Sequence, residues 1–303
     1  GIGTQMLKIK SYVKVKSIAE AYELNQKKTA LVLGGMVWLK MGNRNISTAI
    51  DLSGLGLDTV QETDDEFVIG CMTPLRELEI NKRLNEYTHG AVRESLRHIV
   101  GVQFRNCATI GGSIWGRYGF SDVLTMFLAM DTWVELYDAG RIPLTEFVNR
   151  KKDNDILVNI IVRKQPLFVC YMSQRNSKTD FPVLTCAASL IGEEARTVIG
   201  ARPARAVVVE DKESILKNFK HMTNKQRVSY AGLFDDVAAS AWYAPGVDYV
   251  KYGRLMYGTG NNLFQPDAQM TRAMFVQVLY ALEGSPSVSG LSLSLIHISE
   301  PTR

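Results

Sequence analysis

Residues 105–113 read Arg105-Asn106-Cys107-Ala108-Thr109-Ile110-Gly111-Gly112-Ser113, so a threonine stands two positions before a pair of glycines. Glycines adopt positive φ and let a ligand approach the backbone closely. Consecutive backbone N–H groups at such a turn, or at the start of a helix, bind phosphate and other anions. The stretch predicts a tight, anion-binding turn, although a diglycine turn alone is not specific.

A second diglycine turn lies earlier in the chain. The apolar run of residues 29–33 ends at Gly34-Gly35 and predicts a buried strand that enters a tight turn. The two turns are about 75 positions apart. Since a dinucleotide carries a pyrophosphate, we expect one such cofactor to be held by both loops.

The segments around these turns alternate between strand and helix patterns. The predicted strands are residues 29–33, 48–52, 67–71, 155–162 and 167–171. Helices are predicted over residues 75–84, with Thr73 as the cap before Pro74, and from Phe181 onward. This alternation predicts an α+β or α/β fold over residues 6–165, followed by a shorter segment over residues 166–222.

The motif order makes the pattern specific. Gly34-Gly35 comes first, then residues 105–113, then Ser121-Asp122, then Leu128-Ala129-Met130-Asp131. This order resembles the FAD-binding subunits of molybdenum hydroxylases, of the xanthine dehydrogenase and carbon monoxide dehydrogenase type. The resemblance implies a PCMH-type, two-subdomain, non-Rossmann FAD-binding fold over residues 6–165 and a partial α/β C-terminal flavoprotein domain over residues 166–222.

The resemblance also implies which residues hold FAD. Residues 31–38 and 109–113 would hold the diphosphate and ribityl chain, Asp122 would add a polar contact, and Ile99 and Leu157 would lie against the cofactor. The predicted residues are Leu31, Val32, Leu33, Gly34, Gly35, Met36, Val37, Trp38, Ile99, Thr109, Ile110, Gly111, Gly112, Ser113, Asp122 and Leu157. Met36-Val37 replace the family's Thr-Asp and Ser113 replaces its Asn, so these side chains differ from the family pattern while the backbone donors are kept.

The segment 166–222 resembles the start of the family's C-terminal domain and looks truncated. Arg175 and Asp180 fall in a YxxxRxxxxD stretch, and residues 199–203 match a GARPxR strand. Tyr171-Met172 stand where the family has a lysine that can touch the cofactor. A plain surface ion pair between Arg175 and Asp180 is the alternative for those two residues.

In the resembled enzymes, a molybdenum centre oxidises the substrate and iron–sulfur clusters pass the electrons to FAD. The implied partners are an iron–sulfur subunit, a molybdopterin-binding subunit, and NAD or another electron acceptor. No side chain of this chain is predicted to be catalytic. No metal site is predicted, because the cysteines at 71, 107, 170 and 186 are too far apart for a CxxC pair.

Residues 229–284 resemble one S-layer homology repeat, a small all-α unit. The matching residues are Phe234-Asp235-Asp236-Val237, Trp242-Tyr243, Gly253, Gly258, Phe264-Gln265-Pro266 and Thr271-Arg272-Ala273. Such repeats bind cell-wall polysaccharide, and Trp242 and Arg272 are the candidate contacts if the chain is exported. Their alternative is a role in supporting the fold.

The composition of the chain and its N-terminal residues exclude some classes of function. The net charge of +4 comes without a basic stripe, which argues against nucleic acid binding, and no apolar run suits a membrane span. Met6 reads as the natural start and no leader precedes it, so we expect a cytoplasmic protein.

Residues 285–303 are interpreted as a linker and a non-native tail, because residues 293–303 resemble a translated sequencing adapter. The alternatives to a flavin subunit are a cell-wall-binding surface protein and an assembly chimera of the two, joined near residues 220–230.

Overall fold

The computed structural model describes residues 7–35, 45–201, 205–209, 234–238, 241, 243–252 and 255–282. The chain divides into two compact units, residues 1–211 and residues 212–303. We describe each unit by itself.

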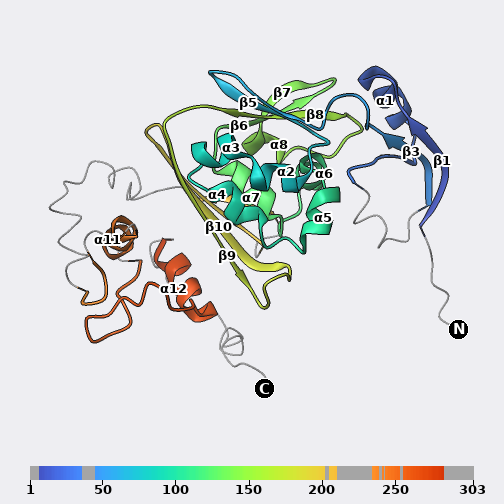
Figure 1. The fold of residues 1–303 in the computed structure, drawn as a ribbon. Coiled ribbons are helices and arrows are strands. Elements are labelled where there is room, and N and C mark those ends of the chain that lie inside the picture. The colour runs from blue at the N-terminus through green and yellow to red at the C-terminus, as the bar shows by residue number, and fades with distance from the viewer. Residues whose placement is uncertain are drawn as a thin grey trace, which may run out of the picture. The chain divides into compact units, whose positions relative to one another are not determined.

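The first unit begins with a small parallel sheet in the order β1-β3-β2, covered by helix α1 (Figure 1). Its elements are β1 (Lys8–Lys14), α1 (Ile18–Asn25), β2 (Ala30–Val32) and β3 (Asn45–Asp51). Ser17 caps α1 by accepting a hydrogen bond from the Glu20 backbone N–H at 3.1 Å. The predicted strands at 29–33 and 48–52 correspond to β2 and β3, and β2 leads directly into Gly34.

A second sheet is antiparallel and has the order β4-β5-β8-β6-β7. Its strands are β4 (Val60–Glu62), β5 (Glu66–Gly70), β6 (Thr132–Leu136), β7 (Gly140–Pro143) and β8 (Leu157–Arg163). The central strand β8 is largely buried, as its run of Leu157-Val158-Asn159-Ile160-Ile161-Val162 predicts. Strands β5 and β8 were both predicted from their apolar runs.

In the described part of this unit, helices α2 to α8 follow α1 and connect and cover the sheets (Figure 1). They are α2 (Leu75–Ile80), α3 (Lys82–Tyr87), α4 (Ala91–Leu96), α5 (Val102–Cys107), α6 (Ile110–Gly116), α7 (Asp122–Leu128) and α8 (Leu144–Phe147). Every residue of α7 is buried, and its cap Ser121 accepts from the Leu124 N–H at 3.1 Å. Helix α7 is therefore the centre of the core.

The predicted helix over residues 75–84 is two helices. Asn81 has an extended backbone, with φ −63° and ψ 114°, and its side chain accepts from the Leu84 N–H at 2.9 Å. Asn81 thus ends α2 and caps α3. The predicted cap was also one residue early, because Pro74 is the N-cap of α2 and the Thr73 hydroxyl bonds the Thr59 carbonyl instead.

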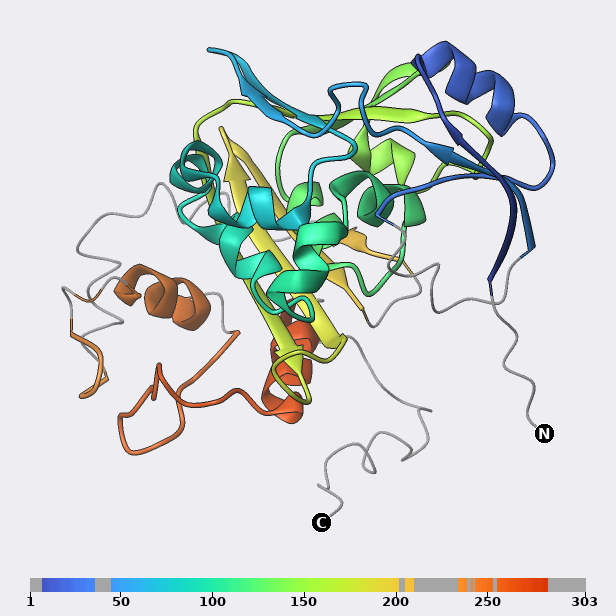
Figure 2. The ribbon, with the colours of Figure 1, turned by 45° about the vertical axis from the view of Figure 1, so that its right-hand side comes forward.

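The last part of the unit is an antiparallel sheet in the order β12-β11-β10-β9 (Figure 2). Its strands are β9 (Leu167–Arg175), β10 (Pro182–Ile191), β11 (Glu194–Gly200) and β12 (Val207–Val209). The helix predicted from Phe181 is wrong, because residues 182–191 pair with both β9 and β11. One face of the sheet packs on α4 and α7.

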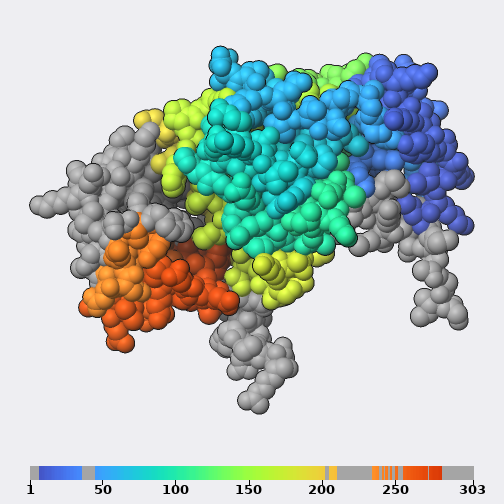
Figure 3. All heavy atoms as spheres, viewed as in Figure 1, coloured from blue at the N-terminus to red at the C-terminus, as the bar shows by residue number. Residues whose placement is uncertain are grey.

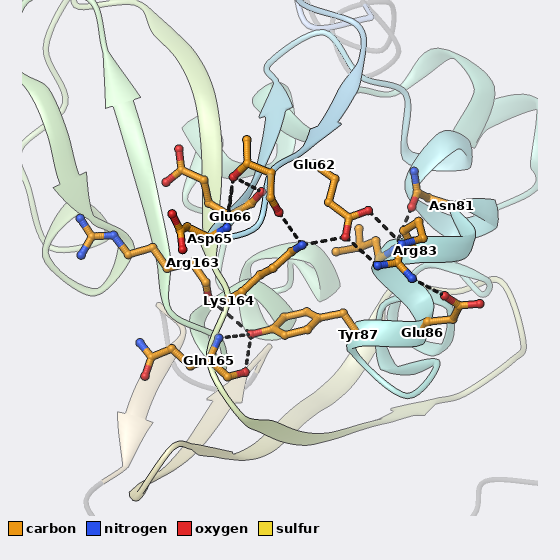
Figure 4. Close-up of polar contacts among 12 residues, drawn as sticks. Glu62, Asp65, Glu66, Asn81, Arg83, Glu86, Tyr87, Arg163, Lys164 and Gln165 are labelled. Atoms are coloured by element: carbon orange, nitrogen blue, oxygen red, sulfur yellow. Dashed lines mark hydrogen bonds and ion pairs between the residues drawn. The ribbon is translucent and has the colours of Figure 1, made fainter.

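The connection between β8 and β9 is fixed by polar contacts (Figure 4). The Lys164 ammonium donates to Glu62 Oε1 at 2.7 Å and to the Thr63 carbonyl at 2.6 Å. Arg83 on α3 also pairs with Glu62, and the Tyr87 hydroxyl accepts from the Gln165 N–H at 3.1 Å. These contacts tie the start of the C-terminal sheet to α3 and to the β4–β5 hairpin.

We predict that Glu62→Gln lowers stability in a pH-dependent way. Hydrogen bonds from Arg83 and Lys164 lower the pKa of the Glu62 carboxyl from 4.5 to about 2. The depressed folded-state pKa means that the contribution is fully present above about pH 5 and is lost as the pH falls toward 2. The urea midpoints of wild type and variant should therefore differ at about pH 6 and converge toward about pH 2.

Glu23→Gln is the control for this prediction, because Glu23 on α1 is exposed and forms no ion pair with a described residue. Its urea midpoints over the same pH range give the baseline with which Glu62→Gln is compared. A constant difference between Glu62→Gln and wild type down to the lowest pH would contradict the prediction.

The second unit contains the described helices α11 (Ala244–Tyr252) and α12 (Arg272–Leu282). Phe234, Val237, Ala244 and Val247 form its described core. The predicted cap at Thr271 is present, since its hydroxyl accepts from the Met274 N–H at 3.2 Å. Asp236 accepts from the backbone N–H groups of Phe264 and Gln265, at 2.8 and 2.6 Å, and these bonds lower the pKa of its carboxyl.

The fold as a whole is mixed α/β. Within the described part of the chain, every helix is too short or too polar to span a lipid bilayer. Residues 283–303, which include the interpreted linker and tail, lie outside the described residues.

Candidate cofactor-binding site

The structure brings the two glycine turns into contact. Gly34 follows β2, and residues 109–112 form the start of α6. A Cβ atom added to Gly34 would lie 3.0 Å from Gly112 Cα and 3.2 Å from Thr109 Oγ1. The two backbones therefore touch, with no room for a side chain between them.

Two further glycines are required by sterics. Gly35 has φ +82°, and a Cβ there would lie 1.9 Å from the Cys107 carbonyl oxygen. A Cβ on Gly111 would lie 2.4 Å from the Cys71 carbonyl oxygen. Gly35 therefore lets the first turn pack closely against the end of α5, and Gly111 lets α6 pack closely against the end of β5.

The two turns differ in the backbone donors that they leave free. The N–H groups of Ile110 and Gly111 donate to the carbonyls of Thr73 and Cys71, at 3.0 and 2.8 Å, and that of Gly112 donates to Thr109 Oγ1 at 3.2 Å. Among the described residues, the N–H groups of Gly34 and Gly35 have no such partner. The first turn therefore supplies the free donors for an anion, and the second turn supports it.

A cavity of about 200 Å³ lies beside these glycines, and we call it the β2 cavity. Eight predicted residues line it, namely Leu31, Val32, Leu33, Gly34, Thr109, Gly111, Gly112 and Leu157. Sequence reasoning missed the rest of its wall, which consists of Asn25, Ala30, Leu52, Cys71, Met72, Trp115 and residues 153–156. Asn25 is held there by donating to the Asn154 carbonyl at 2.8 Å.

A larger cavity of about 410 Å³ adjoins the first, and we call it the hairpin cleft. One wall comes from the segment between α4 and α7 and the other from the tip of the β9–β10 hairpin, which lies beside that segment in Figure 3. The predicted residues Ile99, Gly112, Ser113 and Asp122 line it. Gly112 lines both cavities, so a long ligand could occupy the two together.

Sequence reasoning missed the aromatic part of the cleft. Tyr118 stacks on Phe120 with a ring separation of 5.2 Å, and Phe181 packs edge-on against Phe120 at 5.0 Å. All three rings line the cleft. The Tyr118-Gly119-Phe120 stretch between the second glycine turn and Ser121-Asp122 was the signal available for two of them.

Asp122 is buried in a polar network at the base of the cleft. Its carboxylate accepts hydrogen bonds from the Tyr171 hydroxyl and from Arg175 Nη2. Burial raises the pKa of the Asp122 carboxyl, while the Arg175 guanidinium and the Tyr171 hydroxyl act in the opposite direction. Burial also raises the pKa of Tyr171 well above 10, so its hydroxyl stays a hydrogen-bond donor.

The alternative reading of Arg175 and Asp180 as a surface ion pair is wrong. The Arg175 side chain is only 7% exposed and forms its salt bridge with Asp122. Its Nε donates to the backbone carbonyl of Asp180 at 3.0 Å, and not to the Asp180 carboxylate. Of the pair at the family's lysine position, Tyr171 is buried and Met172 is exposed.

The other predicted residues lie apart from the two cavities or outside the description. Ile110 is fully buried in the core, and neither Ile110 nor Gly35 lines a cavity. Met36, Val37 and Trp38 lie outside the described residues, as do Trp242 and the side chain of Arg272.

The residues present fit FAD. An extended dinucleotide needs free donors for its phosphates. The Gly34 amide belongs to a residue that lines the β2 cavity, and the Gly35 amide follows it in the same turn. Its flat ring system needs an apolar slot, and the adjoining cleft has aromatic and aliphatic walls. The steric limits at Gly34, Gly35 and Gly111 explain why this cradle needs glycine.

Comparison with known families agrees with this fit. Residues 6–164 match the family described as FAD binding domain in molybdopterin dehydrogenase. The chain belongs to this family, so it is an oxidoreductase subunit whose cofactor is FAD. Residues 233–274 match the S-layer homology domain.

Individual relatives extend the comparison. The uncharacterized protein YgfM of Escherichia coli K12 is 25% identical over 215 residues, which cover 68% of this chain and 79% of YgfM. A carbon monoxide dehydrogenase chain from Hydrogenophaga pseudoflava has a TM-score of 0.62 at 19% identity, with 82% of this chain and 94% of that chain covered. Quinoline 2-oxidoreductase from Pseudomonas putida 86 has a TM-score of 0.61 at 16% identity, with 91% and 97% covered. At these identities the two solved structures show a shared fold.

Proposed function

We propose that this chain is the electron-transfer flavin subunit of a molybdenum hydroxylase. Electrons would enter from iron–sulfur clusters on a partner chain, after substrate oxidation on a molybdopterin-binding chain, and would leave to NAD or another acceptor. Two solved structures that share this fold support partners of that kind. One is named as a Cu,Mo-CO dehydrogenase, and the Hydrogenophaga pseudoflava enzyme is described as lacking the Mo-pyranopterin moiety of the molybdenum cofactor.

The contact between Gly34 and Gly112 is the observation that carries this proposal. It holds Gly34, which lines the β2 cavity, against Gly112, which lines both the β2 cavity and the hairpin cleft. We place the diphosphate at Gly34 and Gly35 and the ring system in the hairpin cleft. Leu31, Val32, Leu33 and Leu157 would exclude water from one end, and Ile99 and Ser113 from the other.

The chain's own residues bind and orient the cofactor in this proposal. When bound, FAD supplies the redox chemistry, so the protein contributes position and electrostatics. We assign no side chain as an acid, base or nucleophile. The predicted domain limits, 6–165 for the FAD-binding domain and 166–222 for the truncated one, remain part of the proposal.

The test is to purify the full chain, desalt it and record its visible spectrum, and to titrate FAD into the cofactor-free form by calorimetry. We expect a yellow protein with flavin absorption and saturable heat of binding. Anaerobic reduction followed by addition of NAD would then identify the acceptor. A folded, colourless chain that shows no heat on titration would overturn the proposal.

A second candidate function rests on the S-layer homology match at residues 233–274. The chain would then bind cell-wall polysaccharide through residues 229–284, proposed as a small all-α repeat, and would act at the cell surface instead of in the cytoplasm. Sedimentation with purified cell wall tests this function, and loss of sedimentation in Trp242→Ala would assign the contact. Amplifying the gene from source DNA across the codons for residues 220–230 tests whether the two parts belong to one natural chain.

A further inference from the structure

The hairpin cleft contains one buried positive charge. Among the described residues that line the cleft, Arg175 is the only cation, and its side chain is 7% exposed. The other charged residues in the lining are Asp122 and Asp180. A charge in a buried, apolar setting acts more strongly on its surroundings than the same charge in water.

The position of Arg175 is fixed on three sides. Its Nη2 donates to Asp122, its Nη1 donates to Ser173 Oγ, and its Nε donates to the Asp180 carbonyl at 3.0 Å. A guanidinium carries five N–H donors, so these bonds do not use all of them. The Tyr171 hydroxyl donates a hydrogen bond to the other carboxylate oxygen of Asp122.

We propose that Arg175 sets the reduction potential of the bound FAD, with Asp122 and Tyr171 as its positioning residues. The proposal rests on the proposed function, because it places the ring system in the hairpin cleft. At neutral pH, FAD takes up two electrons with about one proton, so the reduced form carries about one more negative charge. A fixed cation in the cleft therefore favours the reduced form, and the Asp122 carboxylate partly offsets that effect.

This arrangement adds a second role to the one predicted for Asp122. The sequence resemblance implies a direct polar contact between Asp122 and the cofactor. In the structure both carboxylate oxygens already accept hydrogen bonds from protein groups. In this proposal Asp122 acts on the potential through its pairing with Arg175, and the two residues should shift the potential in opposite directions.

The test compares the midpoint potential of FAD in the full-length wild type, Arg175→Gln, Arg175→Lys and Asp122→Asn. The potentials come from dithionite titration against a reference dye. An opposite charge at close range changes an ionisation equilibrium by about tenfold or more. Arg175→Gln should weaken binding of reduced FAD relative to oxidised FAD about tenfold, which lowers a two-electron potential by about 30 mV.

Asp122→Asn should raise the potential, because it removes the offsetting negative charge and leaves the cation. Arg175→Lys keeps the charge and should stay close to wild type. Arg141→Gln is the matched control, since it removes one arginine charge from a partly exposed pair with Glu66 that is outside the lining of either cavity. Its potential should equal that of wild type.

Opposite shifts in Arg175→Gln and Asp122→Asn support the proposal. Shifts of one sign, or no shift in a variant that still binds FAD, overturn it. If Arg175→Gln does not fold, Asp122→Asn decides alone, and an unchanged or lowered potential is then the negative result. Failure of the wild type to bind FAD would instead overturn the proposed function.

Discussion

Gly35→Ala is expected to lower the affinity for FAD at least about tenfold and to destabilise the first unit by about 3 kcal/mol. Two causes act together. Gly35 has φ +82°, which costs a residue with a Cβ about 1–2 kcal/mol. The new Cβ would also lie 1.9 Å from the Cys107 carbonyl oxygen, so the turn must move away from α5 and take the free Gly34 and Gly35 amides with it.

Gly56→Ala separates these two causes. Gly56 also has a positive φ, +73°, but no atom lies within 4 Å of its added Cβ. Gly56→Ala should therefore destabilise the first unit only through the unfavourable positive φ, by about 1 kcal/mol, and should leave the FAD affinity unchanged. Calorimetry gives the affinity for FAD. Chemical denaturation, followed by tryptophan fluorescence, gives the stability of both variants. A Trp242→Phe background confines the fluorescence signal to the first unit. Equal effects of the two substitutions would show that the contact with Cys107 does not position the turn.

Much of the glycine cradle is readable from sequence because its determinants are local. A strand that ends in Gly34-Gly35, and a threonine before Gly111-Gly112, each specify a turn within a few residues. The sequence does not show which amides stay free. That depends on Thr73 and Cys71, whose carbonyls accept from the second turn at 3.0 and 2.8 Å across more than thirty positions of chain.

The hairpin cleft was predicted less well, because it depends on pairing between strands. Residues 182–191 are apolar enough for either a helix or a strand, and only their register with β9 and β11 makes them a strand. That register brings the hairpin tip, with Arg175 and Phe181, to the wall opposite Ile99. Short apolar runs do not distinguish a strand from a helix, so the sequence does not predict the hairpin. Without the hairpin, the sequence does not show that Arg175 is buried, and Arg175 can be interpreted as a surface residue.

Glu79→Met is expected to destabilise the first unit by about 3–5 kcal/mol, because it leaves the buried charge of Arg105 without its carboxylate partner. Arg105, the first residue of the 105–113 stretch, is 4% exposed. Its Nε and Nη2 donate to the Glu79 carboxylate at 2.7 and 3.3 Å, and its Nη1 donates to the Ile99 carbonyl at 3.0 Å. Without Glu79, the buried Arg105 guanidinium loses its carboxylate partner, as does Arg76, which pairs with Glu79 at 3.0 Å but is 34% exposed.

The double variant Glu79→Met/Arg105→Met tests this cause, because replacing both members of a buried pair with apolar residues of similar size is far less costly than removing one. It should recover more than half of the lost stability. Glu66→Met is the partly exposed counterpart, since Glu66 also accepts two bonds from an arginine, Arg141, at 3.2 Å each, and it should cost no more than about 1 kcal/mol. Because Arg105 also holds the carbonyl of Ile99 in the cleft wall, Glu79→Met should weaken FAD binding as well. A double variant as unstable as Glu79→Met would show that packing between α2 and α5, and not the stranded charge, accounts for the loss.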